Sequence, residues 1–89
     1  MEIRWTPRAS RDMDEIAERS PRVAAAVVEF IYGELARDPR RVGKPLRFEL
    51  EGRYSARRAE YRVIYRIDET DDIVRVERVG RRRDIYRPS

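Results

Sequence analysis

The sequence predicts an α+β domain in which an N-terminal helical hairpin packs on one face of a small antiparallel β-sheet. Residues 7–38 have apolar side chains at helical spacing, and residues 46–79 change to an alternation of apolar and polar side chains. The length of 89 residues allows a single domain, residues 1–89, with a modest core. Because helices would cover only one side of the sheet, its other face is expected to be open.

The first part of the chain predicts a short strand followed by two helices. Residues 2–6 suit a first strand. Thr6 and Ser20 are each followed by a proline, an arrangement that caps a helix and begins its first turn. A wide apolar stripe in the second helix stops at Asp38-Pro39, where the helix is expected to end. The two helices should therefore form a hairpin with one apolar face to bury.

The second half predicts three or four strands joined by short connections. The candidate strands are residues 46–50, 53–58, 60–67 and 73–79, with turns at Gly52 and at 68–72 and a short tail or helix at the C-terminus. In the clearest strand, Tyr61, Val63 and Tyr65 share one face. Arg62 and Arg66 lie on the opposite face, and we expect them to line up there with arginines from neighbouring strands.

Positive charge is concentrated in one segment of the chain. The net charge is +4, and residues 1–39 contribute −2, residues 40–66 contribute +6 and residues 67–89 contribute zero. Twenty of the 21 cations are arginine, which binds phosphate oxygens through two hydrogen bonds at once. A GC-rich genome would also favour arginine codons, but it would not cluster the charge. The clustering indicates a surface that binds a polyanion.

The composition argues against several kinds of function. The chain has no cysteine and no histidine, so disulfides and thiol chemistry are excluded. It has no apolar run of 18 residues and no signal-like N-terminus, which predicts a cytoplasmic location with no membrane contact. The acidic residues within 68–72 are interpreted as a solvated turn. We therefore expect neither a metal site nor a cofactor.

Several short motifs, taken together and in order, resemble the RelE/ParE superfamily of bacterial toxins, and within it the RelE branch. The motifs are Pro45-Leu46, Leu50-x-Gly52, Arg57, Tyr61-Arg62-x-x-Tyr65 and the closing Gly80-x-Arg82 with Tyr86. The resemblance covers essentially the whole chain. It implies the toxin of a type II toxin–antitoxin system, a metal-independent endoribonuclease that enters the ribosomal A site. There the 2′-hydroxyl of the messenger RNA attacks the adjacent phosphate.

The resemblance also implies partners. The toxin would be held inactive by a cognate acidic antitoxin, either RelB-like or Phd/YefM-like. It would act on the ribosome and messenger RNA, and it would meet operator DNA only through the antitoxin complex. The antitoxin is expected to lie along the basic segment, residues 40–66, as an added strand or helix.

Finally, the resemblance implies the site residues. The catalytic set is Arg57, Arg62, Arg82 and Tyr86, and the set that binds messenger or ribosomal RNA is Lys44, Arg47, Arg53, Arg58 and Arg81. Arg82 matches an arginine at the scissile phosphate, and Tyr86 a tyrosine that stacks on a base or assists proton transfer. Two usual base positions differ, because Ser55 replaces a lysine and Arg81 a frequent histidine. Since arginine stays protonated, we expect catalysis by charge stabilisation and positioning.

The residue that transfers protons stays open, and so do two alternative functions. Tyr86 is the first candidate for proton transfer, with Glu49, Glu51 and Glu60 as weaker ones. A ParE-like protein would instead inhibit DNA gyrase by protein contact. A non-toxic basic module would only bind nucleic acid. The closing Gly80-x-Arg82 motif favours the nuclease.

Overall fold

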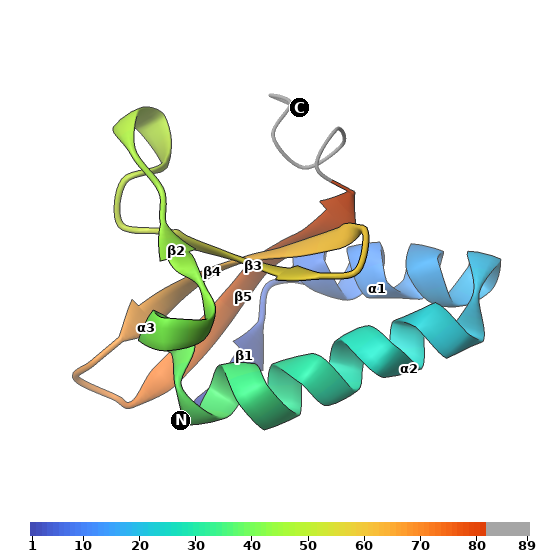
Figure 1. The fold of residues 1–89 in the computed structure, drawn as a ribbon, viewed down its shortest axis with the longest axis horizontal. Helices are drawn as coiled ribbons and strands as arrows, with labels where there is room; N and C mark the ends of the chain where they lie inside the picture. Colours follow the sequence, from blue (N-terminus) through green and yellow to red (C-terminus); the bar gives the residue numbers. More distant parts are fainter. Residues whose placement is uncertain (82–89) are drawn as a thin grey trace.

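The computed structural model describes residues 1–81 of the chain (Figure 1). Its elements are β1 (Glu2–Trp5), α1 (Pro7–Arg19), α2 (Pro21–Phe30), the π-helical turn η1 (Ile31–Leu35), α3 (Pro39–Val42), β2 (Lys44–Pro45), the 3-10 turn η2 (Phe48–Leu50), β3 (Tyr54–Arg58), β4 (Tyr61–Asp68) and β5 (Ile73–Arg81). The predicted α+β class is confirmed, with α1 and α2 packed on one face of a sheet. The predicted C-terminal tail or helix lies outside the described residues.

The sheet has five strands in the order β1-β5-β4-β3-β2. Four of these strands pair antiparallel, but β1 runs parallel to β5, so the sheet is mixed and not wholly antiparallel as predicted. Parallel neighbours need a long connection between them. Here the helical hairpin and the remaining strands supply it, because β1 begins the described fold and β5 ends it.

Both helices begin as the sequence predicted. The side chain of Thr6 accepts a hydrogen bond from the Ala9 amide at 3.1 Å, and that of Ser20 accepts one from the Val23 amide at 3.3 Å. Proline occupies the first turn of each helix. Within residues 1–81, no helix combines the length and the apolar character needed to cross a membrane.

The core lies between the helices and the sheet. Its buried residues are Ala9, Ile16, Ala24, Val27, Phe30, Ile31, Leu35, Ala56, Val63, Tyr65, Val74, Val76 and Val79. Tyr65 is the largest fully buried side chain, and its hydroxyl donates a hydrogen bond to the Pro39 carbonyl at 2.5 Å. A Cβ on Gly43 would lie 1.9 Å from that hydroxyl oxygen, so only glycine fits there. Tyr65 is therefore a core residue that ties α3 to β4.

Stability should fall above about pH 10 because of Tyr65. Burial raises the pKa of the Tyr65 hydroxyl, and the neighbouring Tyr54 raises it further. The unfolded tyrosine ionises near pH 10 while the folded one keeps its proton, so this contribution is complete below that pH and is lost above it. We expect Tyr65→Phe to lose about 1–2 kcal/mol at pH 8. Above pH 10 its free energy of unfolding should fall less steeply than that of the wild type.

The measurement is urea unfolding between pH 8 and pH 11. The control is Tyr32→Phe, since Tyr32 is 55% exposed. If the free energy of unfolding fell equally steeply with pH in the wild type and in Tyr65→Phe, the assignment to Tyr65 would be contradicted.

Residues 46–50 are not the strand that their alternation predicted. Strand β2 ends at Pro45, and residues 46–53 leave the sheet as a protruding loop, which we call the arm (Figure 1). Phe48 and Gly52 have positive φ angles of 58° and 90°, and the Arg53 amide bonds back to the Leu50 carbonyl at 3.1 Å. Phe48 is consequently 90% exposed. Alternation produces a strand only where a partner strand and a core are within reach.

Strand β5 contains a bulge at Glu77. Ile64 of β4 pairs with Arg78, whereas the next residue, Tyr65, pairs with Val76, so Glu77 is the extra residue. The bulge has a clear cause in the sequence. Val76 and Val79 are both buried in the core although they are three residues apart, and a regular strand would place them on opposite faces.

Candidate functional site

Arginines from neighbouring strands meet on the sheet face opposite the helices, which we call the open face. The strand register places Arg62 of β4 between Arg57 of β3 and Gly80 of β5. Nearer the other end of β4, Arg66 pairs with Arg75 of β5. The predicted line of arginines across the strands is thus present in the structure.

Gly80 makes the surroundings of Arg62 unusual. A glycine inside a strand often marks a place where a ligand or another backbone approaches closely. Arg62 is half-buried, with Arg57, whose Nε donates to the Ala59 carbonyl at 3.0 Å, on its β3 side and no side chain on its β5 side. This arrangement leaves room for a phosphate group beside two arginines.

The floor of the open face is buried. Ile64 and Ser55 pair with each other across β4 and β3, and they are only 4% and 8% exposed. Both lie on the same side of the sheet as Arg62. Interactions between charges are stronger near such a water-poor floor than in bulk water. The half-buried Arg62 can therefore bind an anion more firmly than an exposed arginine would.

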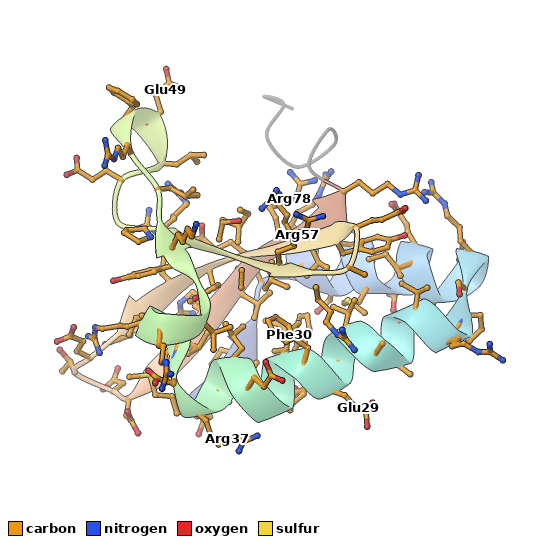
Figure 2. The ribbon with its side chains drawn as sticks, in the orientation of Figure 1. Glu29, Phe30, Arg37, Glu49, Arg57 and Arg78 are labelled. Atoms are coloured by element: carbon orange, nitrogen blue, oxygen red, sulfur yellow. The ribbon has the colours of Figure 1, made fainter. Side chains whose placement is uncertain are left out.

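A groove runs along the outer edge of the sheet beside the open face. It consists of two adjoining hollows of about 420 and 650 Å³ between α2, η1 and β3, and both are lined by Phe30, Glu34, Arg37 and Arg57. Figure 2 shows Phe30 directed from α2 toward the sheet and Glu29 directed away from it. Strand β2 pairs only with Tyr54 and Ser55, so the rest of β3 has no strand beside this edge in the described fold. Arg57 lies where the groove meets the open face.

Three of the predicted RNA-binding residues lie on or near the arm. Lys44 is exposed on β2, and Arg47 is exposed at the start of the arm. Arg53 lies at the base of the arm, and its side chain is 27% exposed. These residues flank the end of the open face that carries Arg66.

Two other predicted binding residues lie on the helix side of the sheet. Arg58 pairs with Tyr61 in the register and lines the smaller hollow. Arg81 also pairs with Tyr61, and its guanidinium lies 5.9 Å from the centre of that ring and 3.7 Å from Glu60. The structure therefore does not bring Arg58 and Arg81 together with Arg62. Arg82 and Tyr86, the remaining catalytic candidates, lie outside the described residues.

The open face also carries an acidic residue, Glu77, that was not among the predicted site residues. Glu77 accepts a hydrogen bond from Arg53 Nε at 2.5 Å and another from Arg66 Nε at 3.0 Å. Its side chain is 20% exposed. The signal was present in the sequence as the three-residue spacing of Val76 and Val79. That spacing breaks the alternation and indicates a bulge.

The weaker acidic candidates for proton transfer lie elsewhere. Glu49 is exposed near the tip of the arm (Figure 2), and Glu51 is also exposed on the arm. Glu60 lies in the turn between β3 and β4, with a side chain that is 76% exposed. In the described part of the chain, no three acidic side chains stand close enough to share a metal ion.

The family model and the relatives at 53% and 46% identity place this small basic domain in the class of type II toxin–antitoxin toxins. The chain belongs to the family of ParE toxins of the type II system parDE, whose family model matches residues 3–86. Within that family it is RelE-like. It is 53% identical over 85 residues to the toxin RelG of Mycobacterium tuberculosis, a match that covers 96% of this chain and 94% of RelG.

Two further comparisons agree. The toxin RelE of the same organism is 46% identical over 82 residues, which cover 92% of this chain and 81% of that protein. The crystal structure of the M. tuberculosis toxin–antitoxin complex RelBE2 contains a chain that superposes with a TM-score of 0.84. That chain is 51% identical, and the match covers 91% of this chain and 96% of that one. The family resemblance recognised in the sequence is confirmed.

Proposed function

We propose that this toxin is a ribosome-dependent endoribonuclease that cuts messenger RNA in the ribosomal A site and so inhibits translation in the cytoplasm. The observation that carries the proposal is the position of Arg62. It lies half-buried on the open face, with Arg57 on one side and the side-chain-free Gly80 on the other. The identity with the toxins RelG and RelE supports a toxic role for the chain.

The proposed chemistry needs no nucleophile from the protein. The oxygen of a ribose 2′-hydroxyl forms a bond to the adjacent phosphorus, and the bond from phosphorus to the 5′ oxygen breaks. Water takes up the 2′ proton, and the departing 5′ oxygen gains a proton from water. The products are a 2′,3′-cyclic phosphate and a 5′-hydroxyl. Arg57 and Arg62 stabilise the negative charge that develops on the phosphorane oxygens, a contribution that is often the largest in catalysis.

The ribosome would contribute positioning. In-line attack requires that the RNA backbone be held in an unusual geometry, and holding it can supply much of the rate enhancement. Arg82 is proposed to bind the scissile phosphate, and Tyr86 to stack on a base or relay a proton. Lys44, Arg47 and Arg53 are proposed to bind RNA around the arm.

Removing the substrate 2′-hydroxyl should abolish cleavage. With ribosome-bound messenger RNA, we expect cleavage to persist at EDTA concentrations that leave ribosomes intact, because the nucleophile comes from the substrate. Replacing the 2′-hydroxyl before the cut by hydrogen should stop it. Primer extension and mass analysis of the ends should show a 2′,3′-cyclic phosphate. Efficient cleavage of the 2′-deoxy substrate, or a need for metal beyond that of the ribosome, would refute the proposal.

The proposed partner is an acidic antitoxin, and the M. tuberculosis relative is found in a toxin–antitoxin complex. The groove and the unpaired edge of β3 offer it a route, since an extended segment can add there as a strand. Arg37, Arg41, Arg57 and Arg58 line this route and outnumber Glu29, Glu34 and Asp38. An acidic segment fits this excess of positive charge. A small acidic protein encoded beside the toxin gene is the expected candidate.

Inhibition of DNA gyrase is the second candidate, because the matching family model is that of ParE toxins. Expression of the toxin alone in a bacterial host separates the two functions. An endoribonuclease arrests translation. A gyrase inhibitor induces the SOS response and filamentation, and a basic module without toxicity does neither.

A further inference from the structure

Glu77 is the extra residue of the bulge in β5, so a regular strand would not place its side chain where it lies. The bulge in β5 removes it from the pairing with β4, and its carboxylate lies between the side chains of Arg53 and Arg66. Those two arginines come from the base of the arm and from β4. The three side chains, which we call the Glu77 cluster, thus connect the arm with the two central strands.

The contacts in the Glu77 cluster use one particular part of each guanidinium. Glu77 Oε1 accepts from Arg53 Nε at 2.5 Å, and Oε2 accepts from Arg66 Nε at 3.0 Å. A guanidinium has five N–H donors, and a bond at Nε leaves the two terminal Nη groups as further donors. Arg66 Nη1 reaches the base of the arm, where it lies 3.5 Å from the point that a Cβ on Gly52 would occupy.

We propose that Glu77 is a positioning residue that holds the guanidiniums of Arg53 and Arg66 on the open face in the orientation that receives RNA phosphates. This inference rests on the proposed function, since it assumes that RNA is the polyanion bound there. A long side chain that is already ordered loses less freedom when its ligand binds. Binding of phosphate oxygens would therefore cost Arg53 and Arg66 less conformational entropy.

The proposal and a simple charge argument predict opposite results for Glu77→Gln. If only total charge mattered, removing a negative charge from a basic face would strengthen RNA binding. If Glu77 orders the two arginines, the amide will hold them less well, and binding will weaken although the net charge rises. We expect about tenfold weaker binding.

The experiment measures binding of the full chain to a short single-stranded RNA by fluorescence anisotropy over a series of salt concentrations. Glu15→Gln is the matched control, because Glu15 is exposed on α1 and the same charge is removed. Each lost phosphate contact lowers the salt slope by about 0.7 on single-stranded RNA. We expect Glu77→Gln to lose one to two such contacts and Glu15→Gln to lose none. Binding by Glu77→Gln that equals or exceeds that of Glu15→Gln would overturn the proposal.

A second measurement separates this inference from the proposed function. In ¹⁵N spectra of the free wild-type protein, the Nε–H signals of Arg53 and Arg66 should be distinct and slow to exchange, and Glu77→Gln should broaden them. If these signals change while the wild type neither binds nor cuts RNA, the proposed function fails, and only the ordering of the two arginines by Glu77 is supported. Fast exchange of both signals in the wild type would overturn the positioning role.

A second variant covers the case in which Glu77→Gln does not fold. Arg66 has a side chain that is 45% exposed, so Arg66→Lys is expected to fold and it keeps the net charge. Lysine lacks the forked donor and cannot reproduce the Nε bond to Glu77. We expect the salt slope of Arg66→Lys to fall by about 0.7, which corresponds to the loss of one phosphate contact. An unchanged slope and affinity would count against the Glu77 cluster.

Discussion

Replacing Arg62 by alanine should slow RNA cleavage by about 10²–10³-fold, the usual cost of removing one preorganised group that stabilises transition-state charge. The fold should stay intact, because Arg62 lies on the open face and is not part of the core. Arg62→Lys should recover only part of the activity, since lysine cannot make the paired hydrogen bonds of arginine to phosphate. The measurement is single-turnover cleavage of ribosome-bound messenger RNA.

The matched control is Arg22→Ala, which removes an equal charge from an exposed position on α2. It should cleave at nearly the wild-type rate. Circular dichroism and thermal unfolding establish that each variant is folded. Wild-type cleavage by folded Arg62→Ala would remove Arg62 from the site. An equal loss in Arg22→Ala would show that overall charge, and not position, decides the rate.

Replacing Asp12 by alanine should lower the free energy of unfolding by about 2–3 kcal/mol, because a buried amide loses its acceptor and a partly buried ion pair is broken. Asp12 is 7% exposed, and its Oδ2 accepts from the Val79 amide at 2.9 Å and from Arg78 Nε at 3.0 Å. Strand β1 pairs with β5 only as far as Val76, so the edge of β5 at Val79 relies on Asp12. The substitution would leave a buried amide and a guanidinium without their acceptor.

Urea unfolding measures this loss. Asp12→Asn keeps an oxygen for the Val79 amide but loses the charge, and it should lie between the wild type and Asp12→Ala. Asp14→Ala is the control, since Asp14 is exposed on the same helix and should change stability by at most about 0.5 kcal/mol. A free energy of unfolding for Asp12→Ala within about 0.5 kcal/mol of the wild-type value would show that Asp12 does not stabilise the edge of β5.

Much of the site was predictable from the sequence because the relevant signals are local. The alternation in β4 places Arg62 on one face and Val63 on the other, and the structure agrees. What could not be predicted was which neighbours Arg62 has. Placing Arg57 and Gly80 beside it requires the register of three strands, and register is decided by contacts between residues far apart in the chain. Arg58 follows Arg57 directly in β3, so the alternation within that strand already places it on the helix side.

Local signals were enough to predict the two helix starts, the α+β class and the basic segment, because capping and periodicity act over a few residues. Three other features needed tertiary contacts, although the spacing of Val76 and Val79 already indicates that β5 contains a bulge. Strand β1 is parallel to β5 because both must flank the same core, and the arm leaves the sheet because no partner strand continues beside it. The bulge at Glu77 follows from the need to return Val79 to the core, and it places a carboxylate between two arginines that the linear sequence keeps apart.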